Sequence, residues 1–205
     1  MRTQRSRKNW RALLRTLEGA TRTDVFEAAK DLSNFSRHNN LLANALVRVL
    51  KNGRRPLNRA AAAYAIGFLG NRRAIPALEK VLANKAESRF VRSNAAEALA
   101  YLSSNGSIPL LTRQLGDPSK DVRFWCAFAL GVAGTLDRRR AAVAVPSLRR
   151  LLRDHRVVKG FWPVAREAEM AIARIEGRED DAEKIDAEVY RVWIRGRRSR
   201  RRRVR

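Results

Sequence analysis

The stretch Val91-Arg92-Ser93-Asn94-Ala95-Ala96-Glu97-Ala98-Leu99-Ala100-Tyr101-Leu102 decides the fold of this chain of 205 residues. It is echoed by Val122-Arg123-Phe124-Trp125-Cys126-Ala127-Phe128-Ala129-Leu130-Gly131-Val132-Ala133. Both stretches begin with Val-Arg and carry small residues and a leucine at the same later positions. A further match places Arg59, Arg92 and Arg123 at spacings of 33 and 31 residues. A period of this size is typical of stacked helical units.

The second half of each unit repeats as well. A proline opens it, at Pro76, Pro109 and Pro146, and a leucine follows six residues later. Apolar residues recur at intervals of three and four in both halves, which is typical of amphipathic helices, and proline is tolerated in a first helical turn because its missing N–H would be unpaired there. The polar residue after each pair is expected to cap the next helix, at Asn84, Asp117 and Asp154.

The repeat predicts an all-α fold, since no period-two strand pattern persists anywhere. The helices are expected from the cap at Thr23-Asp24 to about 35 with 40–51, then 56–70 with 74–84, 88–103 with 107–116, 119–134 with 140–153, and 163–175. The fourth pair carries about one and a half extra helical turns around Asp137-Arg138-Arg139-Arg140.

The run Val-Arg-x-x-Ala-Ala-x-Ala-Leu, followed by Ile-Pro-x-Leu, resembles the HEAT-like repeats of phycobilisome-lyase type proteins over residues 22 to 177. The resemblance implies a right-handed α-solenoid of about five HEAT-like helix pairs. It also implies an internal ladder at the paired Asp/Val-Arg positions, which here are Arg59, Val91, Arg92, Asp121, Val122 and Arg123. These arginines are therefore expected to join the repeats and not to contact a ligand.

The charge is extreme and unevenly distributed. The chain has 44 Lys and Arg against 20 Asp and Glu, a formal net charge of +24. Four segments are predicted: a basic arm and capping helix at 1–20, the repeat solenoid at 21–178, an amphipathic acidic helix at 179–195, and an Arg-rich tail at 196–205. The acidic helix is expected to mask part of the tail, because a run of like charges without a counter-charge repels itself.

Cysteine usage and hydropathy suggest a compartment. Cys126 is the only cysteine, so an intrachain disulfide is impossible and a reducing compartment is expected. Its place between Trp125 and Ala127 favours a buried, inert thiol. No secretory segment and no apolar run of about 18 residues is present. A cytoplasmic location without a membrane span is therefore predicted.

Side chains that carry chemistry are sparse. His38 and His155 are the only histidines, and neither neighbours a glutamate, so the His-Glu pairs that bind di-iron in HEAT-repeat deoxyhypusine hydroxylases are missing. No phosphate-binding glycine loop and no nucleophile with a paired base is found. We expect no catalytic site, metal, cofactor or small-molecule substrate. A HEAT-like bilin lyase or alkylpurine DNA glycosylase is a weaker alternative, in which Trp125 and Trp162 would be contact aromatics, although packing between repeats is the favoured interpretation of both.

Two binding functions remain open. The favoured one is a non-enzymatic scaffold for an acidic macromolecular partner, an acidic protein or a nucleic acid, whose concave face would present Lys80, Arg113, Gln114, Arg149, Arg150 and Arg153. The alternative is a sequence-nonspecific nucleic-acid-binding protein, because basic groups spread over arm, body and tail suit phosphate. Its polyanion contacts would be Arg138, Arg139, Arg140, Arg197, Arg198, Arg200, Arg201, Arg202 and Arg203.

Overall fold

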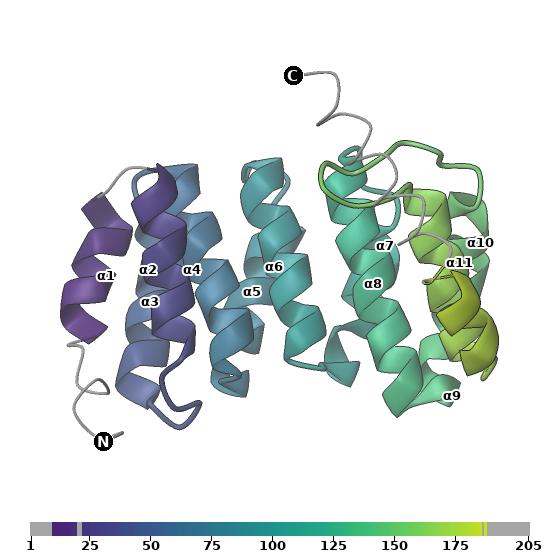
Figure 1. Ribbon diagram of the computed structural model, residues 1–205, viewed down its shortest axis with the longest axis horizontal. Coiled ribbons are helices and arrows are strands. Elements are labelled where there is room, and N and C mark those ends of the chain that lie inside the picture. The colour runs from purple at the N-terminus through teal and green to yellow at the C-terminus, as the bar shows by residue number, and fades with distance from the viewer. Residues whose placement is uncertain (1–9, 20–21, 186, 188–205) are drawn as a thin grey trace. The chain divides into compact units, whose positions relative to one another are not determined.

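The described residues form helices joined by short loops (Figure 1). The computed structural model describes residues 10–19, 22–185 and 187. The chain divides into two compact units, Met1–Ser104 and Asn105–Arg205. Within the described residues there is no strand, and the one β-type contact is an isolated bridge between Val157 and Pro163. The predicted all-α fold of repeated helix pairs is confirmed.

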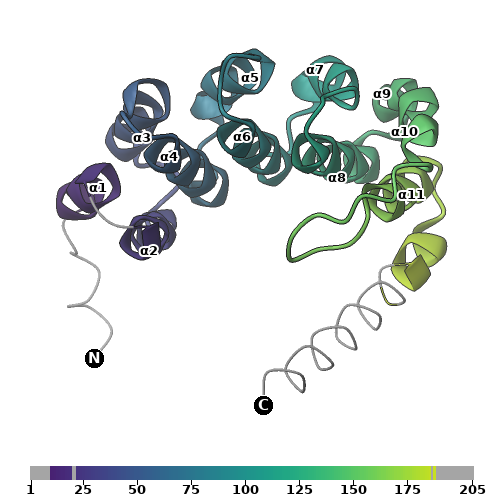
Figure 2. The ribbon, with the colours of Figure 1, turned by 90° about the horizontal axis from the view of Figure 1, so that it is seen from above.

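The first unit is a two-layered stack of helices. In chain order they are α1 (Trp10–Gly19), α2 (Arg22–Ser33), α3 (Asn40–Asn52), α4 (Pro56–Leu69), a 3-10 turn (Arg72–Ala74), α5 (Ile75–Ala83) and α6 (Arg89–Tyr101). Helix α4 packs against α2, α3 and α6. Figure 2 shows α3 and α5 in one layer and α4 and α6 in the other.

The second unit repeats this arrangement. Its elements are a 3-10 turn (Asn105–Ser107), α7 (Ile108–Gln114), α8 (Lys120–Leu136), α9 (Arg138–Ala141), a second 3-10 turn (Ala142–Ala144), α10 (Val145–Leu151) and α11 (Val164–Ile175). Helix α8 packs against α7 and α11, and α10 also packs against α11. The predicted acidic helix begins at residue 179 and is helical at 179–185 and 187, and its remainder lies outside the described residues.

The proline and insertion signals are confirmed. Pro76, Pro109 and Pro146 lie in the first turns of α5, α7 and α10. The extra residues of the fourth pair lengthen α8 to 17 residues and form the short helix α9. Asp137 stands at the junction, where its Oδ1 accepts a hydrogen bond from the backbone N–H of Arg140 at 3.1 Å.

The predicted capping role of the polar residue after each pair is wrong. Each of these side chains instead accepts a hydrogen bond from the backbone N–H two residues later, as an Asx turn. The three residues are Asn84, Asp117 and Asp154. The N-cap positions of the following helices are Ser88, Ser119 and Pro163, and of these only the side chain of Ser88 accepts a capping hydrogen bond, from the backbone N–H of Phe90. The reason is reach, because an Asx side chain bonds its own local backbone and the next helix begins further along the chain.

Small residues allow the helix backbones to approach closely. A Cβ added to Gly67 of α4 would lie 2.8 Å from the Cα of Ala98 on α6. In the second unit, a Cβ on Gly134 of α8 would lie 2.6 Å from Cγ1 of Ile175 on α11. Such contacts explain why alanine and glycine recur in the repeat, because larger residues would separate the two helices.

The predicted arginine ladder is present, with acids from loops as its partners. Arg59 donates to the backbone carbonyl of Gly53 at 2.6 Å. It also donates to both carboxylate oxygens of Glu87, at 2.8 Å in each case. Arg92 donates from Nε to the carbonyl of Glu87 at 3.2 Å. Arg123 repeats the pattern of Arg59, with the carbonyl of Asp117 and the carboxylate of Asp154. The ladder arginines are therefore structural, as the sequence predicts.

Candidate functional site

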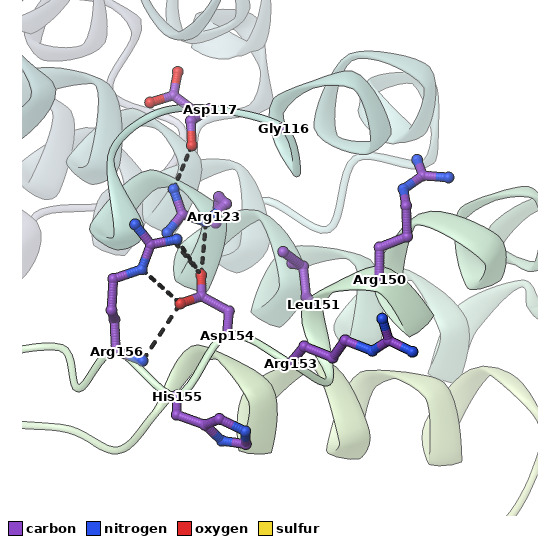
Figure 3. A pocket seen from close by; sticks show the side chains of 9 residues that line it. All are labelled: Gly116, Asp117, Arg123, Arg150, Leu151, Arg153, Asp154, His155 and Arg156. Carbon is purple, nitrogen blue, oxygen red and sulfur yellow. Dashed lines mark hydrogen bonds and ion pairs between the residues drawn. The ribbon is translucent and has the colours of Figure 1, made fainter.

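A positively charged hollow lies in the second unit, between the loop after α7 and the loop after α10 (Figure 3). Its volume is about 720 Å³. It is lined by Gly116, Asp117, Arg123, Arg150, Leu151, Arg153, Asp154, His155 and Arg156. Four arginines face two aspartates, so the lining is basic overall. We call these residues the arginine pocket.

The base of the arginine pocket is a buried ion pair. Arg123 and Asp154 are only 5% and 8% exposed. Oδ2 of Asp154 accepts from Nε and Nη2 of Arg123, and the remaining guanidinium nitrogen donates to the backbone carbonyl of Asp117. All three nitrogens of Arg123 are thus engaged inside the protein, which leaves it no role in contacting a ligand.

Asp154 also fixes the outer wall of the pocket. Nε of Arg156 donates to Oδ1 of Asp154 at 2.7 Å. Burial on its own would raise the pKa of Asp154, but the hydrogen bonds from Arg156 and Arg123 outweigh burial and hold that pKa below its ordinary value. Asp154 is therefore ionised at neutral pH and committed to two arginines.

The rim arginines Arg150 and Arg153 differ from those at the base. Both are exposed, and Figure 3 shows their guanidinium groups directed away from Asp154. Arg150 donates from Nη2 to the hydroxyl of Ser147 at 2.8 Å. Among the described residues, neither forms an ion pair with a carboxylate. Because guanidinium groups bind oxyanions through parallel N–H donors, this rim is suited to a carboxylate or phosphate.

The loop that carries the pocket is held in place by backbone contacts. The N–H of Val164 donates to the carbonyl of Arg156, and the N–H of Ala165 donates to the carbonyl of Asp154. Lys120 of α8 donates from Nζ to the carbonyl of Val157 at 2.7 Å. The loop segment 154–157 is thus fixed relative to α8 and α11.

The remaining residues predicted for the concave face are dispersed. Lys80 on α5, Arg113 on α7 and Arg149 on α10 are exposed, and Arg149 forms an ion pair with Glu176 at 3.1 Å. Gln114 was expected to be exposed, but it is only 6% exposed, because the last turn of α7 points it into the protein. Of the predicted set, the pocket brings together only Arg150 and Arg153.

The residues predicted to contact polyanions fall into two groups. Arg138, Arg139 and Arg140 are exposed on α9, where Arg138 pairs with Glu179 and Arg140 pairs with Asp137 at 3.4 Å. The tail residues lie outside the described residues, as does the basic arm at 1–9. These tail residues are Arg197, Arg198, Arg200, Arg201, Arg202 and Arg203. Their predicted role stays a prediction.

Trp125 and Trp162 belong to an aromatic cluster in the second unit. Both rings contact Phe124 and Phe161, with centroids 5.1 to 5.8 Å apart and, for the Trp162–Phe161 pair, 5.9 Å apart. Nε1 of Trp162 donates to Oε2 of Glu167 at 2.9 Å, and Glu167 is fully buried. The geometry is that of packing, which was the favoured interpretation. Cys126 is buried beside them, as expected.

A second group of titratable residues, not predicted from the sequence, lies in the first unit. Glu97 of α6 lies between aromatic residues, and burial, partly offset by a hydrogen bond from Tyr101, raises its pKa to about 7. Burial and the charge of Glu97 raise the pKa of Tyr101 to about 12. The signal was present in the spacing of Phe90, Glu97 and Tyr101, which places all three on one face of a helix.

Within the described residues, no group of three or more His, Cys, Asp or Glu side chains could hold a metal ion. His38 is hydrogen-bonded to Arg37, and His155 lies among the arginines of the pocket. Neither histidine belongs to such a group, so the described residues do not fit a di-iron centre. No helix in this part of the chain is both long and apolar enough to cross a membrane.

Comparison with known proteins shows that this chain is similar to proteins named as enzymes. The chain is 35% identical over 127 residues to deoxyhypusine hydroxylase-B of Oryza sativa, covering 60% of this chain and 35% of that protein. It is 41% identical over 70 residues to the deoxyhypusine hydroxylase of Arabidopsis thaliana, covering 34% and 22%. The structure of the complex of CpcE and CpcF of phycocyanin lyase from Nostoc matches with a TM-score of 0.61 and 25% identity, covering 81% of this chain and 64% of that one.

These relatives correct the functional expectation. They are named as enzymes, so the prediction of a non-enzymatic scaffold is wrong. The expectation rested on the absence of catalytic motifs in the sequence, and the similarity to these enzymes contradicts it. The chain spans between 22% and 35% of the length of these two hydroxylases.

The repeat itself is matched over most of the chain. The family model for HEAT repeats matches residues 11–100, 43–131 and 85–173. The matches overlap and together run from within α1 to within α11. The chain therefore belongs to the family of HEAT-repeat proteins.

Proposed function

We propose that this chain takes part in the enzymatic modification of a protein and binds the protein substrate through the arginine pocket. The observation that carries the proposal is the pair of exposed rim arginines, Arg150 and Arg153, which form no ion pair with a carboxylate among the described residues. The enzymatic role is supported by the similar proteins, which are named as hydroxylases and as a phycocyanin lyase.

The charge of the arginine pocket favours binding of an acidic group of the substrate protein. Its base is neutralised internally, because Asp154 pairs with Arg123 and Arg156. The positive charge available to a ligand is therefore concentrated at the rim, on Arg150 and Arg153. A glutamate or aspartate side chain of a substrate protein would meet two guanidinium groups there, and hydrogen bonds between such charged groups are about twice as strong as neutral ones.

The chemical step is not assigned to the residues described. Their histidines and carboxylates do not form a group that fits an iron centre, so substrate binding is the part that the geometry supports. The substrate is proposed to be an acidic protein, and the cytoplasmic location expected from the single cysteine stays a prediction.

The test is the affinity for a fluorescent acidic peptide, a decamer of glutamate and glycine, measured by anisotropy at several salt concentrations. Replacing both rim arginines, Arg150→Ala with Arg153→Ala, is expected to weaken binding by about tenfold or more, as loss of two charge-assisted contacts predicts. The matched control is Arg54→Ala with Arg55→Ala, which removes the same charge from an exposed site in the first unit.

Equal weakening of peptide binding in both double variants would show that the peptide is attracted by net charge alone. That result would contradict binding at the arginine pocket. The enzymatic part is tested separately, by comparing intact masses of cellular proteins with the wild-type chain, with the rim variant and without the chain. A mass shift that needs the chain and is lost in the rim variant is expected. No chain-dependent mass shift on any protein would contradict the enzymatic role while leaving the peptide result standing.

A further inference from the structure

Five aromatic rings of the first unit contact one another in a row, and two of them, Tyr64 and Tyr101, interact with Glu97. The rings come from α2, α4 and α6, and α4 packs against both other helices. Neighbouring rings contact each other in the order Phe90, Phe26, Tyr64, Phe68 and Tyr101, with centroids 6.1, 5.9, 4.6 and 4.4 Å apart. We call these five residues the aromatic arc.

The arc begins and ends on α6, and Glu97 lies between its two ends. Glu97 follows Phe90 by seven residues and precedes Tyr101 by four, so all three share one face of the helix. The hydroxyl of Tyr101 lies 3.5 Å from Oε1 of Glu97, which is long for a hydrogen bond between oxygens. The charge of Glu97 also acts on Tyr64, whose pKa is raised by burial and by that charge. The carboxylate thus interacts with Tyr64 of α4 and Tyr101 of α6.

The carboxylate of Glu97 combines partial burial with the lack of an ion pair among the described residues. The chain has more than twice as many basic as acidic residues, and carboxylates such as Glu87 and Asp154 are paired with arginines. Among the described residues, no ion pair includes Glu97. A carboxylate that is partly removed from water without a cation is costly unless it becomes protonated or gains a cationic ligand.

The arc is open to ligands. Phe68 is 43% exposed, Phe90 is 38% exposed and Tyr101 is 42% exposed. Exposed large aromatic side chains that contact one another form a patch, and such patches mark interaction surfaces when a polar group lies within them. The faces of aromatic rings carry negative charge density that attracts cations, most strongly where water is excluded. The rings and the carboxylate of Glu97 therefore both favour a positively charged ligand.

We propose that the aromatic arc and Glu97 form a binding site for an alkylammonium group. The ammonium would pair with the carboxylate of Glu97, and the alkyl chain would lie against the exposed rings of Phe68 and Tyr101. A simple apolar ligand would use the rings and leave the carboxylate without a partner. The ligand chemistry is shared by a free alkylamine and by a lysine side chain of a protein, and the site is separate from the arginine pocket.

The decisive experiment compares two probes of nearly equal shape, n-pentylamine and n-pentanol, on the full chain at pH 8. Binding is followed through the NMR signals of the tyrosine and phenylalanine rings. The amine is expected to bind at least about tenfold more tightly than the alcohol, a ratio that corresponds to about 1.4 kcal/mol. A blocked lysine peptide, N-acetyl-Gly-Lys-Gly-amide, is measured in parallel. Binding of the peptide assigns the site to a protein side chain, and binding of pentylamine alone assigns it to a free amine.

The variant Glu97→Gln keeps the shape of the side chain and removes its charge. It is expected to weaken amine binding by about tenfold and to leave pentanol binding unchanged. The matched control is Glu27→Gln, which removes the charge of an exposed glutamate on α2 and is expected to change neither. Equal affinity for amine and alcohol would show an apolar surface only, and absence of binding by both would show closed packing. Either of these two results overturns the proposal. Both are measured on the wild-type chain, so neither depends on whether the Glu97→Gln variant folds.

Discussion

The guanidinium of Arg123 donates two hydrogen bonds to one carboxylate oxygen of Asp154, from Nε at 2.9 Å and from Nη2 at 2.7 Å. The third nitrogen donates to the carbonyl of Asp117. Arg123 of α8 therefore holds the loop that precedes α8 and the loop that follows α10 together, through a hydrogen bond to the first and a buried ion pair with the second. Arg59 and Glu87 form the same connection two repeats earlier, in the first unit.

Replacing Asp154 by alanine is expected to destabilise the second unit strongly. The substitution leaves the buried charge of Arg123 without its counter-charge, which typically costs about 3–5 kcal/mol. The measurement is urea unfolding followed by circular dichroism. Asp181→Ala is the control, because Asp181 pairs with Arg178 on the surface, where both side chains are nearly half exposed, and its loss should cost at most about 1 kcal/mol. Equal effects would contradict the structural role assigned to Asp154.

Asp154 is also expected to determine how the stability of the fold decreases at low pH. Its pKa is lowered in the folded state, because the hydrogen bonds from Arg156 and Arg123 outweigh the effect of burial. A carboxyl group of this kind stabilises the fold above its ordinary pKa, and the contribution is lost as the pH falls through the lowered folded value. Stability of the wild-type chain should therefore fall below about pH 4 more steeply than that of Asp154→Ala. Parallel acid limbs would be inconsistent with this pairing.

Gly134 of α8 is expected to tolerate no side chain. A Cβ there would lie 2.6 Å from Cγ1 and 3.1 Å from Cα of Ile175, so Gly134→Ala should force α8 and α11 apart. The overpacking is expected to cost about 1–3 kcal/mol, more than the gain in helix propensity returns. Thermal unfolding is the measurement. Gly19→Ala serves as the control, since nothing lies within 4 Å of the added atom, and a lower melting temperature for both variants would argue against this explanation.

The repeat and its helices could be predicted from the sequence because they rest on local and periodic signals. The prolines of α5, α7 and α10, the alanines of α4 and the ladder arginines each follow from the spacing of the copies. The pairing of Arg123 with Asp154 could not be predicted, because it joins residues 31 positions apart through the geometry of two loops. Gln114 was misplaced for a similar reason, since its exposure depends on where α7 ends.

The candidate sites were harder to predict than the fold. Arg150 and Arg153 were named, but nothing in the chain distinguishes them from Arg149, which pairs with Glu176. Glu97 went unnoticed because its environment is built by α2, α4 and α6 together. HEAT-repeat deoxyhypusine hydroxylases were considered and set aside because neither histidine neighbours a glutamate, whereas the similarity to these enzymes lies in the repeats.

Trp162 is expected to stabilise the second unit through its indole nitrogen. Nε1 donates to Oε2 of Glu167, and Glu167 is fully buried. Trp162→Phe keeps most of the ring contacts and removes this donor, so a loss of about 1–3 kcal/mol is expected. Trp125→Phe is the matched control, because Trp125 packs against the same rings and no hydrogen bond is found for its indole among the described residues. Equal losses in urea unfolding would show that ring volume alone matters.

Glu97 should make the stability of the first unit decrease as the pH rises. Burial, partly offset by the hydrogen bond from Tyr101, raises its pKa to about 7, against 4.5 for an ordinary glutamate. The folded state therefore favours the protonated form, whose stabilisation is fully present below pH 4.5 and is lost as the pH rises through 7. The other groups that act on Glu97 are Tyr64 and Tyr101, whose raised pKa values keep both neutral throughout this range.

Glu97→Gln should remove this loss. At pH 8 the variant is expected to be more stable than the wild-type chain by on the order of 1–3 kcal/mol, and at pH 4 the two should be equally stable. Urea unfolding at four pH values between 4 and 8 measures the difference. Glu27→Gln, at an exposed position on α2, should show no such trend. A variant less stable than wild type at pH 8 would mean that a cation within the protein already compensates the ionised Glu97, which would also leave the aromatic arc without a vacancy for an ammonium ligand.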